Sequence, residues 1–354
     1  MPIIFLLFLG LLTQTPPQSK PTPTAPPVMR GDPNSNVPAQ PSRKHENEMQ
    51  EVAENDVISV DTTVVNVPVS VLQRDGKYVP NLNKEDFRLW EDGVEQQIAY
   101  FASVEKPFTV VLMLDISDST EQRLPEIKQA AIAFVEQLRP DDRVLIVSFD
   151  RRINILSEAT SDRNALRQAI LATLPGGGTR LYDAVDFVVN HRLNKIPGRK
   201  AIVLFTDGVD VQSRATSLGN IHDLEESDVL VYPVQFDTES DVREKEGESM
   251  TLRINTPRET SLHQVYVQAG RYLSALADSS GGHLYSAGSQ KSIAQAFALV
   301  AEALRWQYSL GYYPQAPGEP GQRHKVKVRV NRPHVAVRAK ESYLRQPKTE
   351  TNKQ

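Results

Sequence analysis

The sequence predicts an α/β fold: a doubly wound, mostly parallel sheet with helices on both faces, plus a small antiparallel β-sandwich-like domain built from both flanks. Three observations support this prediction. The middle of the chain alternates short apolar strands with amphipathic helices, which is typical of a parallel sheet. The segments on either side alternate apolar and polar residues with period two, as half-buried strands do. Neither flank has enough strands to be stable alone, so we expect the two flanks to pair.

Length and composition limit the classes of protein. A chain of 354 residues is long for one module, and 40% hydrophobic with 24% charged residues excludes wholesale disorder. The net charge of −4 gives no basic surplus, so we do not expect a nucleic-acid partner. The chain has no cysteine, which excludes disulfides, thiolate zinc sites and cysteine nucleophiles.

The N-terminus predicts export. Residues 3–12 (IIFLLFLGLL) form an apolar run that is long enough for a signal-peptide core but shorter than the about 20 residues of a transmembrane helix. We therefore expect a signal peptide at residues 1–15, a periplasmic, envelope or secreted location, and no transmembrane span. Residues 16–56 are rich in proline and polar residues and predict a disordered linker, and residues 346–354 predict a disordered tail.

The β domain is predicted from residues 57–103 and 307–345. Alternating valines over 65–71 indicate a half-buried strand, and Asp92-Gly93 is expected to turn strand 87–90 into strand 94–101. Residues 325–330 (KVKVRV) alternate again and are followed by a second strand at 335–338. Their basic side chains are interpreted as a solvated face that protects a sheet edge.

Residues 105–306 predict the parallel α/β domain. Residues 237–262 carry many charges without a clear period, so we expect an inserted surface loop there. Strands are expected at 108–114, 143–149, 153–156, 201–205, 229–236 and 283–285, and helices at 127–138, from about 162, and at 181–193, 217–226, 266–278 and 293–306.

Oxygen-bearing side chains follow the predicted strands. In an open α/β sheet ligands bind at the carboxyl ends of the strands, so these side chains are expected to meet at one edge. Hydroxyl and carboxylate oxygens suit Mg²⁺, with Mn²⁺ and Ca²⁺ as alternatives. The predicted metal ligands are Asp115, Ser117, Ser119, Thr179 and Asp207.

The ligand types also indicate a function. Two carboxylates balance the charge of a divalent ion, and three hydroxyls add oxygen without adding charge, so the metal can still attract an anionic oxygen from outside. We therefore expect a protein partner that supplies an Asp or Glu carboxylate to the metal. No sequence feature specifies an oligomeric state.

These residues resemble the metal-ion-dependent adhesion site (MIDAS) of von Willebrand factor type A (VWFA) domains. Asp-x-Ser-x-Ser at 115–119, Gly-Gly-Thr at 177–179 and Thr-Asp-Gly at 206–208 carry the resemblance, which covers about residues 107–306. The segments 181–184 (LYDA) and 308–314 (YSLGYYP) are similar to secreted VWFA-related proteins of Acidobacteria. The resemblance implies a non-enzymatic adhesion or interaction protein. It also implies that Asp115, Ser117 and Ser119 bind the metal directly or through water, that Thr179 binds directly in the liganded state, and that Asp207 acts mainly through water.

Other interpretations stay open at this point. One is an envelope scaffold protein in which the metal only stabilises the fold. Another is a metal-dependent hydrolase of doubly wound fold, which is disfavoured because Ser117 stands where such phosphatases need an acid-base Asp. Asp118 replaces a residue that is often glycine in the family, and we expect its side chain to point to solvent. Asp183 and Asp210 are interpreted as turn residues rather than as ligands.

Overall fold

The computed structural model describes residues 64–103, 107–246, 251–252, 260–315 and 318–345, and the statements below concern these residues. All of them belong to the same unit of the chain, Ser59–Gln354. The predicted signal peptide, linker and C-terminal tail lie outside the described residues, as do residues 57–63 of the predicted β domain.

Six strands form the central sheet of the α/β region. They are β5 (Phe108–Asp115), β6 (Arg143–Phe149), β7 (Ile153–Thr160), β8 (Arg199–Thr206), β9 (Leu230–Phe236) and β12 (Tyr285–Ala287). Their order across the sheet is β12-β9-β8-β5-β6-β7, and all neighbours are parallel except β6 and β7. Because both faces of β5 are buried, its sequence is a continuous apolar run rather than an alternating one.

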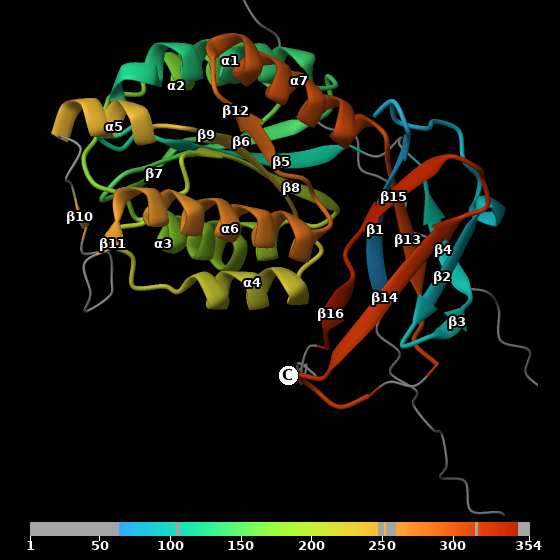
Figure 1. The fold of residues 1–354 in the computed structure, drawn as a ribbon. Coiled ribbons are helices and arrows are strands. Elements are labelled where there is room, and N and C mark those ends of the chain that lie inside the picture. Colours follow the sequence, from blue (N-terminus) through green and yellow to red (C-terminus); the bar gives the residue numbers. More distant parts are fainter. Residues whose placement is uncertain (1–63, 104–106, 247–250, 253–259, 316–317, 346–354) are drawn as a thin grey trace, which may run out of the picture. The chain divides into compact units, whose positions relative to one another are not determined.

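Helices cover both faces of this sheet (Figure 1). Phe134 and Phe297 pack with Leu112 in the core of one face, and Leu181 and Leu273 belong to the core of the other. The first face carries α1 (Leu124–Gln137), α2 (Arg163–Leu171) and α7 (Gln290–Arg305), and the second carries α3 (Leu181–Asp186), α4 (Ser217–Glu226) and α6 (Leu262–Ser280). The two cores confirm the predicted doubly wound architecture.

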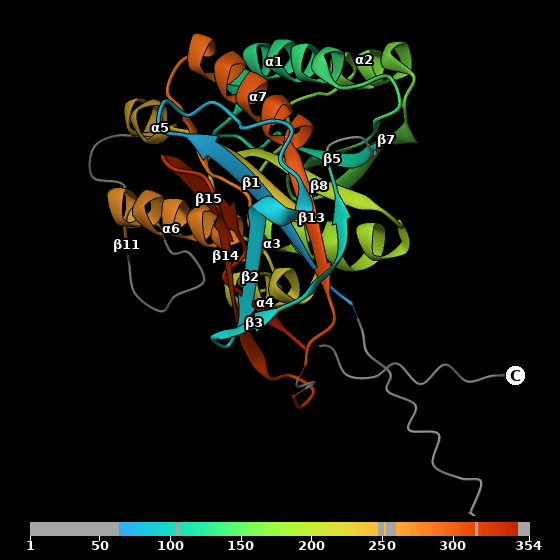
Figure 2. The same cartoon turned by 90° about the vertical axis from the view of Figure 1, so that its right-hand side faces the viewer.

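Two four-stranded antiparallel sheets form the sandwich, and Figure 2 brings it to the front. One sheet has the order β15-β1-β13-β4 and the other β16-β14-β2-β3. Strand β1 of the N-terminal flank pairs with β13 of the C-terminal flank, and β2 pairs with β14, so both flanks build the sandwich as predicted. The strands are β1 (Val65–Gln73), β2 (Phe87–Glu91), β3 (Val94–Gln96), β4 (Ile98–Ala102), β13 (Gln307–Tyr312), β14 (Arg323–Val330), β15 (Val335–Ala339) and β16 (Ser342–Leu344).

The structure contains strands β13 and β16, which the sequence did not predict individually, and it differs from the predicted elements in three further places. The expected strand 94–101 is two strands, because β3 pairs with β2 whereas β4 crosses to the other sheet and pairs with β13. The predicted helix 181–193 continues past α3 as a π-helical turn, Phe187–Arg192.

The third difference lies in the expected loop 237–262. It begins with helix α5 (Glu239–Glu246) and contains two short paired strands, β10 (Thr251–Leu252) and β11 (Thr260–Ser261). Helix α5 has no apolar stripe that could reveal it in the sequence, and the ion pair of Asp241 with Arg123 (2.9 Å) holds it against the domain.

Over the described ranges, no helix is both long enough and apolar enough to cross a membrane.

Candidate functional site

The site lies where β5 and β8 end. These strands are parallel neighbours, with Leu114 opposite Phe205, so the residues that follow them in the chain emerge side by side. Asp115 is the last residue of β5, and Asp207 follows directly after β8. The parallel pairing of β5 and β8 therefore brings together two carboxylates that are 92 positions apart in the sequence.

Hydrogen bonds join these carboxylates to the predicted serines. The Ser117 N–H donates to Asp115 Oδ1 at 3.0 Å, and the Ser119 hydroxyl donates to Asp207 Oδ2 at 2.7 Å. The hydroxyl oxygens of Ser117 and Ser119 are 3.2 Å apart. The Thr120 hydroxyl donates to the carbonyl oxygens of Asp115 and Ser117, which fixes the turn of the loop. Four of the five predicted ligands thus belong to one continuous cluster.

Thr179, the fifth predicted ligand, joins the neighbourhood through its main chain. Its carbonyl oxygen accepts from the N–H groups of Val211 (3.2 Å) and Gln212 (3.1 Å), in the segment that follows Asp207. Its side chain is buried, yet its hydroxyl is not among the hydrogen bonds that link the other four residues. The structure therefore places Thr179 beside the cluster without joining its hydroxyl to it.

The glycines before Thr179 are needed for close approach. A Cβ atom at Gly176 would lie 2.1 Å from Asp150 Oδ2, and Gly178 has φ +65°, where residues with a side chain are strained. Asp150 Oδ2 in turn accepts from the Gly177 N–H at 3.2 Å. Both observations indicate that this loop packs directly on the end of β6.

Asp118 has a role that the sequence did not predict. Its side chain is exposed, as expected, but Oδ2 accepts a hydrogen bond from the Gly178 N–H at 3.0 Å. The carboxylate therefore ties the serine loop to the loop of Thr179 instead of only pointing to solvent.

Burial makes the ionised forms of the two carboxyl groups unfavourable. Asp115 and Asp207 are 0% and 1% exposed. Burial, together with the negative charge of Asp207, raises the pKa of the Asp115 carboxyl from 3.8 to about 7. Burial likewise raises the pKa of Asp207. A divalent cation would remove this repulsion, and the surrounding hydroxyls are the hard oxygen ligands that Mg²⁺ prefers, so the donor set fits such an ion.

Two further threonines support the carboxylates, and sequence reasoning missed both. The Thr206 hydroxyl donates to Asp115 Oδ2 at 2.6 Å, and the Thr238 hydroxyl lies 2.7 Å from Asp207 Oδ2. Thr238 also contacts the Tyr266 hydroxyl at 2.7 Å, which links the site to α6. Thr238 follows shortly after β9, so an examination of every strand end would have found it.

Asp183 and Asp210, which were predicted to be turn residues, accept hydrogen bonds from the main chain. Asp183 Oδ1 accepts from the N–H groups of Arg214 and Ala215, and Asp210 Oδ1 accepts from the Tyr182 N–H, so both stabilise turns. In the part of the chain that the structure describes, no three His, Cys, Asp or Glu side chains form a metal-binding group. That result accords with a ligand set of only two carboxylates, since hydroxyls supply the other oxygens.

Known proteins match part of the chain. The sequence model of the von Willebrand factor type A domain family matches residues 110–209. An uncharacterized protein of Synechocystis sp. is 32% identical over 106 residues, which span 29% of this chain and 25% of that protein. The match thus spans about a quarter of the length of this relative.

Solved structures of several proteins are also similar. A von Willebrand factor type A protein from Catenulispora acidiphila has 10% identity and a TM-score of 0.43, covering 82% of this chain and 76% of that one. Proximal thread matrix protein 1 from the mussel byssus, with a zinc-occupied MIDAS motif, has 14% identity and a TM-score of 0.42, covering 60% of this chain and 49% of that one.

Proposed function

Residues 110–209 of the chain belong to the von Willebrand factor type A domain family, and from this premise we propose that the protein binds a protein partner through a divalent metal ion. The partner supplies an Asp or Glu carboxylate to the ion, and the protein is exported and non-enzymatic. The proposed ligands of the metal are Asp115, Ser117, Ser119, Thr179 and Asp207.

One observation carries this proposal. Two buried carboxylates of raised pKa lie at adjacent strand ends, linked through the Ser117 N–H and the hydroxyls of Ser117 and Ser119. Buried carboxylates without a neighbouring cation are costly, so the cluster favours binding of a positive ion over a purely structural role. Mg²⁺ is proposed first because the site offers only oxygen atoms.

The choice of partner chemistry follows from charge. Asp115 and Asp207 are the only charged groups among the proposed ligands, and together they balance the two positive charges of the ion. The three hydroxyl ligands are neutral and add no negative charge. The ion therefore keeps affinity for one more anionic oxygen, which a partner's carboxylate provides. Thr179 supports this proposal because its hydroxyl is not committed to the other ligands, so it can join the metal when the partner binds.

Export is the part of the proposal that rests on sequence alone. Residues 1–15, the predicted signal peptide, lie outside the described residues. Cell fractionation with an antibody to the protein tests export, and finding all of the protein in the cytoplasm would contradict it.

The metal site is tested by thermal unfolding of the full chain. MgCl₂ at 100 times its dissociation constant should stabilise the wild type by about 2.7 kcal/mol, since the ion binds only the folded state. Asp115→Ala should remove this gain. Asp141→Ala is the matched control, because Asp141 is an exposed aspartate at the opposite end of the sheet, before β6. An equal magnesium shift in the Asp115→Ala variant would refute the site.

Carboxylate binding is tested with the wild type and Thr179→Ala. Glutarate serves as the probe for the partner's carboxylate, and Mg²⁺ affinity is measured by calorimetry with and without it. We expect glutarate to strengthen Mg²⁺ binding in the wild type and to do so less in Thr179→Ala. If Mg²⁺ binds but glutarate has no effect in either protein, the metal has only a stabilising role and the scaffold alternative is correct.

A further inference from the structure

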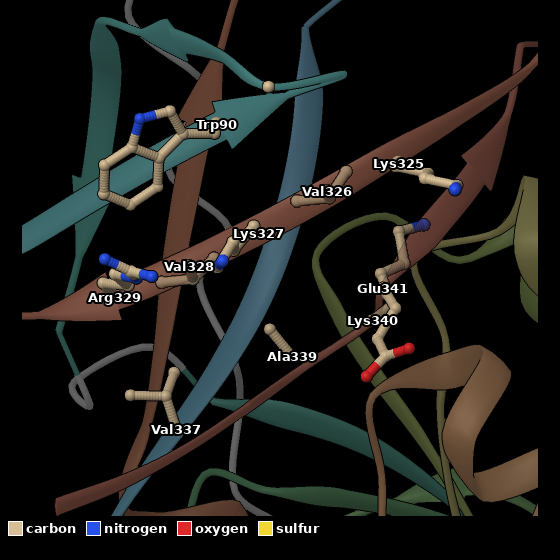
Figure 3. A pocket seen from close by; sticks show the side chains of 11 residues that line it. Trp90, Lys325, Val326, Lys327, Val328, Arg329, Val337, Ala339, Lys340 and Glu341 are labelled. Atoms are coloured by element: carbon tan, nitrogen blue, oxygen red, sulfur yellow. The ribbon is translucent and has the colours of Figure 1, made fainter.

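The sandwich has an opening between two of its strands, on which the proposed metal site does not depend. Strands β14 and β15 follow each other in the chain but belong to different sheets. Between them lies a cavity of about 660 Å³, which is within the range of small-ligand pockets (Figure 3). We call this the β14–β15 window. It is lined by Trp90, Gly93, residues 325–329, Val337 and residues 339–341.

Only part of the edge of β14 is paired along the window. Strand β16 pairs only with residues 323–325 of β14, and beyond it the Val326 N–H donates to the Glu341 carbonyl at 2.7 Å. The Lys325 carbonyl instead accepts from Asp92, on the side of β2. Because successive residues of an antiparallel strand direct their main-chain groups to opposite sides, Val328 directs its groups to the window, and Val330, just beyond the lining, directs its groups to the same edge. No described strand pairs with β14 there.

The floor of the window is apolar. Val326 is buried, and Val328, Val337 and Ala339 are half-buried members of the sandwich core. Figure 3 shows Val337 and Ala339 on β15 across from Val326 and Val328 on β14. An aliphatic side chain placed between the two strands would therefore bury apolar surface on both sides.

The rim of the window is positive. Lys325, Lys327 and Arg329 are exposed on the outer face of β14, and the structure gives Lys327 no ion-pair partner among the described residues. The Arg329 guanidinium lies 5.7 Å from the centre of the Trp90 ring. The acidic side chain that lines the window is Glu341, at the far end from Arg329 in Figure 3. A bound chain would therefore meet a surplus of positive charge.

We propose that the β14–β15 window binds an extended acidic segment of a partner protein, which adds to the free edge of β14 as a further strand. Its main chain pairs with Val328 and Val330. Its aliphatic side chains alternate toward the floor between Val328 and Val337, and its carboxylates alternate outward toward Lys327 and Arg329. Positive charges on an edge strand normally prevent pairing with other strands, and the same charges permit pairing with an acidic one.

The probe is a capped heptapeptide, Asp-Val-Asp-Val-Asp-Val-Asp, added to the full chain. All titrations contain EDTA and use the Asp115→Ala background, so that carboxylate binding at the proposed metal site is absent. Failure of this experiment therefore leaves the metal proposal unaffected. We expect saturable binding that weakens as salt is added, and no binding of the peptide with lysine in place of aspartate.

Variants of the protein locate the site. Lys327→Glu should weaken binding by roughly tenfold, since it replaces an attraction by a repulsion at an exposed position. Lys195→Glu is the matched control: it makes the same change of charge at an exposed lysine of the α/β region and should leave affinity unchanged. Equal affinity of both variants would overturn the proposal.

Two further measurements distinguish strand addition from binding by charge alone. In an extended strand all the valines of the peptide direct their N–H groups to one edge and all the aspartates to the other. Methylating the N–H groups of one set should abolish binding, and methylating the other set should not. Amide hydrogen exchange at Val328 and Val330 should be fast in the protein alone and at least tenfold slower with peptide.

Several results would overturn the proposal. Equal binding of the two methylated peptides would show that no strand is added. Slow exchange at Val328 and Val330 before any peptide is added would show that this chain or a second copy already covers the edge. Absence of binding by the acidic peptide at millimolar concentration would show that the window is not a docking site.

Discussion

The central sheet and the sandwich bury their strands differently, and the difference determines where each can bind a ligand. Strand β5 is buried along its whole length, so its functional groups are confined to its carboxyl end, where Asp115 lies. Strand β14 has one polar face and one apolar face, and part of its edge is unpaired. The first region therefore offers a compact cluster of side chains, whereas the second offers a row of main-chain groups.

The two regions also differ in the groups that surround a buried charge. Lys340, at the end of β15, donates to the Ser227 carbonyl at 2.9 Å, close to the C-terminal end of α4. Carbonyls at a helix C-terminus favour a cation, so the protein itself supplies partners for this charge, although burial still lowers the pKa of the Lys340 ammonium group to about 8. Asp115 has the negative Asp207 nearby and only hydroxyl and N–H groups as partners. Only the second arrangement favours binding of an ion from solution.

The largest predicted difference between the two regions is the loss of stability when a packed side chain is shortened. Leu112→Ala should lower the free energy of unfolding by roughly 3 to 5 kcal/mol, because Leu112 is fully buried in the middle of β5 and its loss leaves a cavity. Val328→Ala should cost about 1 kcal/mol or less, since this side chain faces the open window. Urea denaturation of both variants measures the contrast. Similar losses would mean that the window is packed as tightly as the central sheet.

The next prediction concerns the buried carboxylate. Because the folded pKa of Asp115 is raised from 3.8 to about 7, the folded state binds more protons than the unfolded state between these values. The metal-free wild type should therefore lose stability, by a few kcal/mol at most, as pH rises from about 4 through 7. Asp115→Asn keeps the shape without the charge and should be the more stable protein at pH 8 without metal.

Added Mg²⁺ should reverse that order, because only the wild type retains the charged ligand. Thermal unfolding of both proteins at pH 5 and pH 8, with Mg²⁺ or with EDTA, measures the effect. Parallel pH profiles in EDTA would show that Asp115 does not titrate as its burial requires.

For Lys340 we expect stability to change with pH in the opposite direction and over a different pH range. Burial lowers the pKa of its ammonium group from 10.5 to about 8, so the unfolded state binds more protons between these values. The wild type should gain up to about 3 kcal/mol as pH rises from 8 to 10.5. Lys340→Met has no such charge, so the difference between the two unfolding curves isolates the contribution. A difference that stays constant over this range would contradict the burial of a charged Lys340.

Much of the fold could be predicted from local sequence because the central strands carry continuous apolar runs and their helices carry apolar stripes. The grouping of Asp115, Ser117, Ser119 and Asp207 followed from a general rule, that parallel strands end at one edge of the sheet. Pairing between distant strands is not encoded in any local window. The crossing of β4 to the other sheet was therefore missed, although the pairing of the two flanks could be inferred from their lack of strands.

Other features could not be predicted for different physical reasons. Helix α5 is almost wholly polar and is held by the ion pair of Asp241 with Arg123, so no hydrophobic period reveals it. An examination of every strand end would have made Thr238 a candidate, but its contact with Asp207 requires β9 to lie next to β8, and this order is known only from the fold. The window between β14 and β15 depends on how far β16 pairs, and three residues of pairing leave no trace in the sequence.

The smallest predicted effect tests the link between the two loops of the proposed metal site. Asp118→Ala removes the acceptor for the Gly178 N–H, whereas Asp118→Asn keeps an oxygen that can accept the same bond. Because this hydrogen bond is exposed, we expect Asp118→Ala to change the free energy of unfolding by less than about 1 kcal/mol. The Gly178 amide should nevertheless exchange several-fold faster in Asp118→Ala and at the wild-type rate in Asp118→Asn. Since Gly178 precedes Thr179, faster exchange would show that Asp118 restrains the loop that carries Thr179, the fifth proposed ligand. An unchanged Gly178 exchange rate in Asp118→Ala would show that the packing of Gly176 and Gly177 on Asp150 holds this loop by itself.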